Sequence, residues 1–164
     1  MNIIKIETDN MVNGPGIRVV LWVSGCRHAC PGCHNKETWN FYCGEKYTEA
    51  HLKTILNYLS KNHISGLTIS GGDPLDYMNI TDVRDICKIV HETFPEKSIW
   101  VYTGGKYEDF KYDRIMEYID VLVDGEFIQD LKDKPKVAWR GSSNQRLIDV
   151  KESQKTNSIK YIDS

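Results

Sequence analysis

The sequence predicts an α/β fold, a partial (β/α) barrel of parallel strands formed by a single domain over residues 1–164. Two observations lead to this class. Apolar, β-branched segments alternate with segments of helical periodicity, and a short glycine-containing polar motif follows most of the apolar segments. A chain of 164 residues can bury one sizeable core, but a complete eight-stranded barrel typically takes ~250 residues. We therefore expect an incomplete barrel, whose open side would admit a large substrate.

The first β-α unit begins with a strand at 17–23, whose sequence IRVVLWV is largely apolar and β-branched. It leads directly into Ser24, Gly25 and a cysteine-rich loop, so this loop follows the carboxyl end of a strand. Thr48 is a suitable N-cap for the helix that comes next. Four apolar residues of that helix recur at i, i+3, i+4 and i+7 and form one face: Leu52, Ile55, Leu56 and Leu59.

The same alternation continues along the chain. The expected elements are a strand at 67–70, a helix with Val83, Ile86, Cys87 and Val90 on its apolar face, a strand at 99–102, a helix at about 108–118 and a strand at 121–123. Together they make about four β-α units. Cys87 is interpreted as a small core residue. The polar stretch that follows is not assigned to an element.

Glycine-containing polar motifs follow the ends of four predicted strands. They are Ser24-Gly25-Cys26, Ser70-Gly71-Gly72-Asp73, Thr103-Gly104-Gly105 and Asp124-Gly125-Glu126. We expect them to converge on one rim, because α/β barrels place their sites at the carboxyl ends of the strands. Gly71 and Gly72 would allow the backbone to approach a small ligand closely, and a plain strand-to-helix turn would explain them equally well.

Three cysteines in one loop, Cys26, Cys30 and Cys33, have the spacing C-x3-C-x2-C. Three thiolates are one fewer than the four ligands that usually close a structural zinc site or an iron–sulfur cluster. A [4Fe–4S] cluster held by three thiolates keeps one iron free for a substrate. The spacing therefore favours an open cluster with a chemical role.

Two other interpretations of the cysteines stay open. His28, His34 or Cys43 could supply the fourth ligand of a structural zinc site. Cys43 could instead complete a four-cysteine cluster, and the protein would then be an electron-transfer module.

Composition and charge exclude several functional classes. Five cysteines, three of them crowded together, do not resemble a secreted disulfide framework. A net charge of −2 offers no general attraction to nucleic acid. No stretch approaches the roughly 18 apolar residues of a membrane span, and the amino terminus lacks a targeting pattern. No acid–base pair or Ser-His-Asp order is evident. We expect a cytoplasmic protein that binds neither nucleic acid nor membrane and is not a hydrolase.

Arg18 is a charged residue within the otherwise apolar strand 17–23. A charge at this place needs a partner or an open face, and the alternation of side chains along a strand also allows it to point to solvent. The preceding residues 13–16, Asn-Gly-Pro-Gly, are typical of a turn.

Taken together, these motifs resemble the radical S-adenosylmethionine enzymes, whose signature is C-x3-C-x2-C, here Cys26, Cys30 and Cys33. The segment 13–18, NGPGIR, is similar to the sequence that precedes the cluster in glycyl-radical activating enzymes. The other matching segments are CPGC at 30–33, SGGDPL at 70–75, WVYTG at 100–104, VDGEF at 123–127 and WRGSSNQ at 139–145. The resemblance runs from about residue 12 to residue 146 and covers most of the chain.

The resemblance implies an activity, two cofactors and two partners. A [4Fe–4S] cluster would pass one electron to S-adenosyl-L-methionine, which would split into methionine and a 5′-deoxyadenosyl radical. The radical would remove a hydrogen atom from a glycine of the partner, the glycyl-radical subunit of anaerobic ribonucleoside-triphosphate reductase. The electron donor would be a protein such as reduced flavodoxin, and the activating enzyme could form a homodimer.

The resemblance also implies roles for single residues. The three cysteines of the loop would be the cluster ligands, and Cys43 would be a bystander. Gly71, Gly72 and Asp73 take the place of the motif that holds the methionine amino group, with Asp73 in place of the more usual glutamate.

The adenine of S-adenosylmethionine would lie near Gly32, Cys33 and His34 by the same resemblance. Many relatives have an aromatic residue where this chain has Gly32, so the adenine contact is expected to shift toward His34. The segment 139–145 would either face the partner reductase or form a structural loop.

Overall fold

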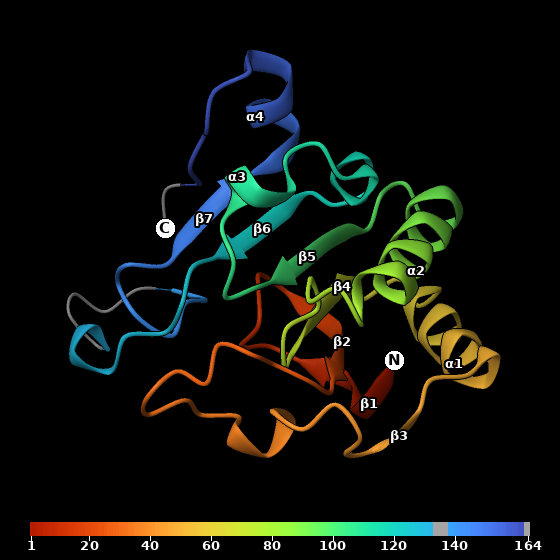
Figure 1. Cartoon of the computed structure of the whole chain (residues 1–164). Helices are drawn as coiled ribbons and strands as arrows, with labels where there is room; N and C mark the ends of the chain where they lie inside the picture. Colours follow the sequence, from red (N-terminus) through yellow and green to blue (C-terminus); the bar gives the residue numbers. More distant parts are fainter. Residues whose placement is uncertain (133–137, 163–164) are drawn as a thin grey trace.

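The computed structural model describes residues 1–132 and 138–162. At its centre is a mixed seven-stranded sheet with the strand order β3-β1-β2-β4-β5-β6-β7 (Figure 1). The strands are β1 (Asn2–Asn10), β2 (Ile17–Val23), β3 (Glu45–Lys46), β4 (Ile64–Gly71), β5 (Ser98–Tyr102), β6 (Val121–Asp124) and β7 (Arg146–Asp149). The helices are α1 (Glu49–Leu59), α2 (Ile80–Thr93), α3 (Tyr107–Phe110) and α4 (Val150–Thr156), with 3-10 turns η1 (Lys36–Thr38), η2 (Arg114–Glu117) and η3 (Gln129–Leu131).

Four neighbouring strands, β2, β4, β5 and β6, run parallel, as the alternation of elements predicted. Three further strands are antiparallel and were not predicted: β1 pairs with β2 and β3, and β7 pairs with β6. The α/β class is therefore confirmed, with a mixed sheet instead of a purely parallel one. The strand pairing by itself does not establish a barrel.

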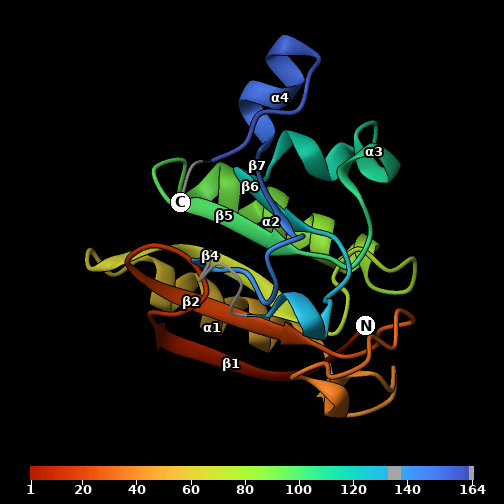
Figure 2. The ribbon, with the colours of Figure 1, turned by 90° about the vertical axis from the view of Figure 1, so that its left-hand side faces the viewer.

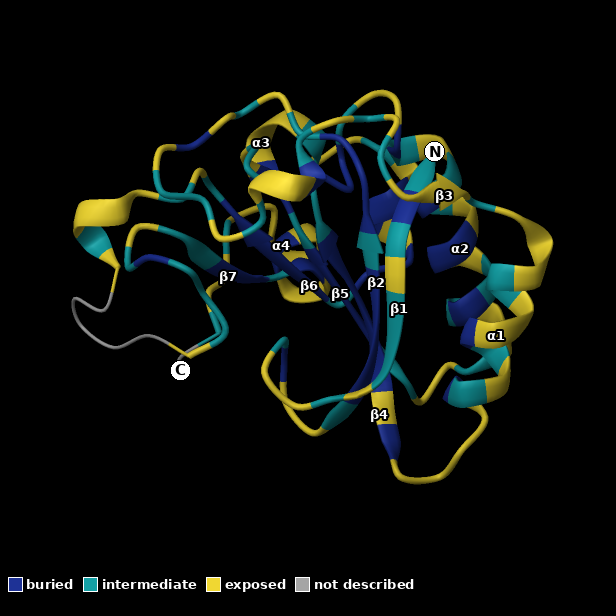
Figure 3. Cartoon of the chain, turned by 90° about the horizontal axis from the view of Figure 1, so that it is seen from below, coloured by how far each residue is buried: buried dark blue, intermediate teal, exposed yellow. Residues whose placement is uncertain are grey.

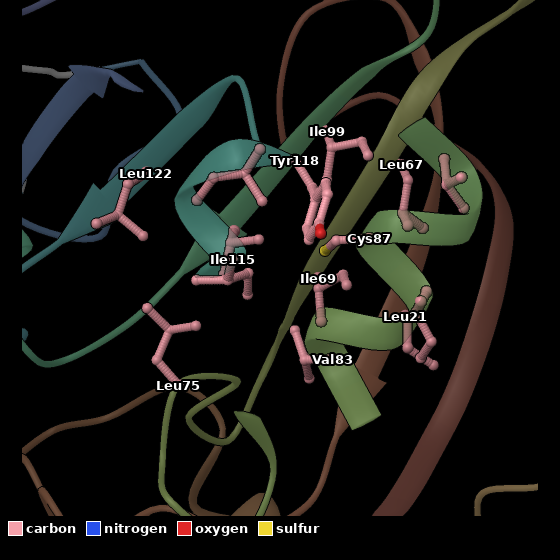
Figure 4. Close-up of a cluster of buried hydrophobic side chains, with 14 of the residues drawn as sticks. Leu21, Leu67, Ile69, Leu75, Val83, Cys87, Ile99, Ile115, Tyr118 and Leu122 are labelled. Atoms are coloured by element: carbon pink, nitrogen blue, oxygen red, sulfur yellow. The ribbon is translucent and has the colours of Figure 1, made fainter. Parts of the chain in front are cut away.

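Helices α1 and α2 lie together on one face of the sheet (Figures 2 and 3). Thr48 is the N-cap of α1, as predicted. The four apolar residues expected on one face of α2 are all buried, and Cys87 among them is a core residue. Figure 4 shows Val83 and Cys87 turned into the same group of buried side chains as Ile69 of β4. Within the described ranges, no helix combines the length and apolar character needed to cross a bilayer.

The prediction of one helix at about 108–118 is wrong, because the structure has two short pieces there, α3 and η2. Asp113 lies between them and caps η2, accepting a hydrogen bond from the Ile115 amide at 2.9 Å. The same carboxylate pairs with Arg84 of α2 at 2.8 Å. An aspartate that bonds to a neighbouring amide starts a new turn and interrupts the helix before it.

The two faces of the sheet have different surroundings. Side chains alternate between the faces, so Ile99 and Val101 join the large core beneath the helices whereas Trp100 belongs to a second, smaller cluster. This second cluster also contains Val121, Val123 and Leu147, with Tyr102 and Trp139 packed against it. The face away from α1 and α2 is therefore covered by loops and aromatic side chains.

Arg18 of β2 is fully buried on this second face. Its Nε donates to the Thr68 hydroxyl at 2.7 Å, and its Nη2 donates to the carbonyls of Leu67 and Ser98, both at 2.8 Å. The guanidinium also lies 5.6 Å from the centre of the Trp100 ring. Burial lowers the pKa of Arg18 to about 10, which still leaves it charged at neutral pH. Of the alternatives that the sequence left open, the buried partner is the correct one.

Arg18→Met would remove this guanidinium together with the hydrogen bonds that it donates to the Thr68 hydroxyl and to the carbonyls of Leu67 and Ser98. A buried polar group without a partner costs about 1–3 kcal/mol, so we expect the free energy of unfolding to fall by about 3 kcal/mol. Arg114→Met is the control, because the Arg114 side chain is 71% exposed and exposed substitutions usually change stability by less than about 0.5 kcal/mol. Urea unfolding under anaerobic conditions measures both variants, and equal losses would contradict the expectation.

Candidate functional site

A cavity of about 450 Å³ opens at the carboxyl ends of β2, β4, β5 and β6. Residues from all four strand ends line it: Cys26, Ser70, Gly71, Gly72, Thr103, Gly104 and Gly125. The motifs that were expected on one rim thus surround one cavity. The parallel pairing of the four strands is the cause, because it brings their carboxyl ends to the same edge.

Three of the four candidate cysteine ligands come together in this cavity. Cys26, Cys30 and Cys33 line it, whereas Cys43 is not among its lining residues. The Cys43 thiol instead donates to the carbonyls of Asn40 and Glu37, at 2.9 and 3.2 Å. Within the described residues, no three Cys, His, Asp or Glu side chains stand close enough together to hold a single metal ion. Burial raises the pKa of Cys26 to about 11 and also raises that of Cys30.

The start of the cysteine loop is hydrogen-bonded to the segment that follows it. The Gly25 amide donates to the Thr38 carbonyl at 2.6 Å, and the Cys26 amide donates to the Trp39 carbonyl at 3.1 Å. Gly25 has a φ of +94°, and a Cβ there would lie 2.0 Å from the Phe41 ring. Glycine is therefore required where β2 turns into the loop.

The glycine motif after β4 contacts the end of β2 through its backbone. The Gly72 amide donates to the Val23 carbonyl at 2.8 Å, and the Asp73 amide donates to the Gly25 carbonyl at 2.7 Å. A Cβ on Gly71 would lie 2.6 Å from the Val23 carbonyl oxygen, and one on Gly72 would lie 2.4 Å from that of Gly25. These glycines do more than form a turn, because their missing side chains let the two strand ends touch.

Asp73 is 4% exposed, and its carboxylate is held by other residues of the chain. It accepts hydrogen bonds from the Thr103 hydroxyl at 2.8 Å and the Leu75 amide at 3.0 Å. Its second oxygen lies 2.7 Å from His28 Nε2, while His28 Nδ1 lies 3.0 Å from Glu126. The hydrogen bond to Asp73, followed by that to Glu126, raises the pKa of His28 to about 9.

Aromatic side chains form much of the remaining cavity wall. The rings of His34 and Phe127 lie 5.1 Å apart, centre to centre, and both residues line the cavity. Gly32, a predicted site residue with a φ of +74°, is not among the lining residues, and a Cβ there would lie 2.4 Å from the Gln129 side chain. Phe127, Trp22 and Tyr102 were not among the predicted site residues. The VDGEF and WVYTG motifs contain two of them, but only the fold shows which side chains face the cavity.

The segment 139–145 has structural contacts and also walls the cavity. The Gln145 side chain accepts a hydrogen bond from the Gly141 amide at 2.8 Å and donates to the Gly125 carbonyl at 2.9 Å. Asn144 donates to the Glu126 carbonyl at 2.8 Å. The segment thereby braces the loop after β6, and its residues Trp139, Arg140, Gly141 and Gln145 line the cavity.

The fold and the site define an α/β protein with a three-cysteine cavity at one edge of its sheet. Comparison with known proteins identifies the family. The family model described as "4Fe-4S single cluster domain" matches residues 12–148. Three curated relatives carry the name anaerobic ribonucleoside-triphosphate reductase-activating protein. The relative from Enterobacteria phage T4 is 46% identical over 147 residues, which are 90% of this chain and 93% of the relative.

The relatives from Escherichia coli K12 and Haemophilus influenzae are 44% and 43% identical, each over 149 residues that cover 88% of this chain and 96% of the relative. The chain therefore belongs to the 4Fe-4S single cluster domain family and, more narrowly, to the family of anaerobic ribonucleoside-triphosphate reductase-activating proteins.

Gly71→Ala should disturb the contact between the ends of β2 and β4, and Gly125→Ala is its matched control. Both positions have a left-handed φ, +108° and +99°, so alanine costs about 1–2 kcal/mol at either. Only at Gly71 would the new Cβ meet backbone at 2.6 Å, whereas the nearest atom at Gly125 is 3.8 Å away. We expect Gly71→Ala to lower the free energy of unfolding by about 1–3 kcal/mol more than Gly125→Ala does. Urea unfolding measures the difference, and no difference would mean that the close approach is unimportant.

Proposed function

We propose that this protein activates anaerobic ribonucleoside-triphosphate reductase by generating a glycyl radical on it, with a [4Fe–4S] cluster and S-adenosyl-L-methionine as cofactors. The observation that carries the proposal is that Cys26, Cys30 and Cys33 line one cavity while Cys43 lies outside its lining. A three-thiolate site leaves a cluster open for a substrate. The names of the relatives support the reductase as the target.

The residues of the cavity fit an iron–sulfur cluster. Thiolates are the donors that iron–sulfur clusters take, and the three proposed ligands come from one loop held at the end of β2. When bound, the cluster would supply the electron that cleaves S-adenosylmethionine, and the resulting radical would take a hydrogen atom from the reductase glycine. Since burial raises the pKa of Cys26, ligation would release a proton from this thiol.

The proposed contacts with S-adenosylmethionine come from two segments of the chain. The backbone of Gly71, Gly72 and Asp73 would bind the methionine amino group. The adenine would lie near Gly32, Cys33 and His34. The aromatic pair formed by His34 and Phe127 supports an adenine position near His34, because its rings offer a surface on which a base could stack.

The remaining proposals concern the shape of the domain, the electron donor, the cellular compartment and the oligomeric state. A partial barrel in a single domain over residues 1–164 would leave the cavity open toward the reductase. The reaction consumes one electron for each cleavage, so a donor such as reduced flavodoxin is required. A cluster of this kind needs a reducing compartment, and we propose the cytoplasm. A homodimer stays a prediction.

Cysteine variants distinguish the activating enzyme from the two alternatives. Cys26→Ala should abolish the [4Fe–4S] signal in electron paramagnetic resonance of the anaerobically reconstituted, dithionite-reduced protein, because two thiolates cannot hold the cluster. Cys43→Ala is the matched control and should keep the full signal. In the wild type, adding S-adenosylmethionine should change the spectrum.

Three results would contradict this proposal. Loss of the cluster in Cys43→Ala would favour the four-cysteine electron-transfer module. A spectrum that does not respond to S-adenosylmethionine would exclude an open iron that binds the cofactor. Zinc without iron in metal analysis would indicate the structural zinc module.

His34→Ala tests the proposed adenine contact. Loss of an aromatic stacking partner costs about 0.5–1.5 kcal/mol, so the concentration of S-adenosylmethionine that half-converts the spectrum should rise about 2- to 12-fold. His63→Ala, which removes a 56%-exposed imidazole elsewhere, is the control. An unchanged concentration in His34→Ala would place the adenine at another wall of the cavity.

A further inference from the structure

His28 connects the cysteine loop to the ends of three strands. It lies in the loop between Cys26 and Cys30, and its two ring nitrogens face Asp73, which follows β4, and Glu126, which follows β6. Between them, at the end of β5, a Cβ on Gly104 would lie 2.4 Å from the His28 ring. Because Gly104 has no side chain, the His28 ring fits beside the end of β5.

The two carboxylates that face His28 differ in burial. The Asp73 side chain is 5% exposed and the Glu126 side chain is 60% exposed. Exposed ion pairs contribute little to stability, whereas a buried carboxylate that loses its partner is costly. The contact between His28 and Asp73, at 2.7 Å, therefore contributes more to holding the loop than the contact with Glu126 does. Since both nitrogens face carboxylates, both contacts can be hydrogen bonds only when each nitrogen carries a proton.

The Asp73 carboxylate is directed into the protein and not into the cavity. Thr103, the Leu75 amide and His28 are its partners. His28, Gly72 and Thr103 line the cavity, but Asp73 is not among the lining residues. A ligand in the cavity can reach the backbone of this motif more readily than the carboxylate.

We infer that His28 is a positioning residue that latches the cysteine loop to the strand ends through Asp73, and that the Asp73 carboxylate serves this latch instead of contacting S-adenosylmethionine. The inference rests on the proposed function for the identity of the group that the loop holds. The latch fixes the span between the first two proposed ligands, so the loop would open when either partner is removed.

Variants His28→Gln and Asp73→Asn, together with the double variant, test the latch. His63→Gln is the matched control, because His63 lies 3.7 Å from Asp9 on the surface, far along the chain from the loop. The first readout is the rate at which the reconstituted protein loses iron to an excess of chelator. Each single variant should lose iron on the order of tenfold faster than the wild type, as expected for a lost charged hydrogen bond, while His63→Gln should not.

The double variant decides whether the two residues act as one unit. If they do, the double variant loses iron no faster than the faster single variant. The inference would be overturned if the double variant lost iron faster by the product of the two single-variant factors. It would also be overturned if His28→Gln lost iron at the wild-type rate. A weaker response to S-adenosylmethionine in Asp73→Asn alone, with His28→Gln unaffected, would overturn it as well, because that result would assign the carboxylate to the ligand.

Amide hydrogen exchange in the metal-free protein separates failure of the latch from failure of the proposed function. Residues 26–33 should exchange faster in His28→Gln than in the wild type or His63→Gln, whether or not the protein takes up a cluster. If the wild type binds no cluster, the proposed function fails while the latch is still tested. Equal exchange in all three proteins would refute the latch itself.

Discussion

The site depends on the backbone contact between the ends of β2 and β4. Two hydrogen bonds, from Gly72 to Val23 and from Asp73 to Gly25, join the glycine motif to the start of the cysteine loop. A side chain on Gly71 or Gly72 would occupy the space that this contact needs. The loop that carries the proposed ligands and the motif proposed to bind the amino group are thus one connected structure. Main-chain atoms set the position of the motif relative to the start of the loop.

The two faces of the sheet pack against different parts of the chain. On one face, aliphatic side chains pack beneath α1 and α2 into a large core. On the other, Arg18 and Trp100 lie beneath loops whose residues line the cavity. The buried Arg18 donates hydrogen bonds to Thr68 of β4 and Ser98 of β5, and it thereby joins these two strands to β2. The carboxyl ends are then free to carry glycines and polar residues that contribute little to the core.

The sequence predicted the parts of the fold that have strong local patterns. Residues 17–23 form β2 with the bounds expected, and the apolar face of α2 contains the four residues named for it. Of the three strands that were not predicted, β1 and β7 were missed for identifiable reasons. β1 mixes charged and apolar residues along its length, and β7 has four residues that form a strand only through pairing with β6. The helix expected near residue 113 failed because Asp113 bonds to a neighbouring amide and to Arg84.

The sequence by itself determined the class of the fold, the convergence of four strand ends and the spacing of three cysteines, because these follow from short-range periodicity and from positions along one loop. Tertiary structure decided where single polar side chains point. Cys43, ten residues beyond Cys33, lies outside the cavity lining, whereas Asp73 meets His28 across 45 residues of chain. Such contacts depend on which strands become neighbours and how closely their ends approach. A single sequence does not contain a local signal for that distance.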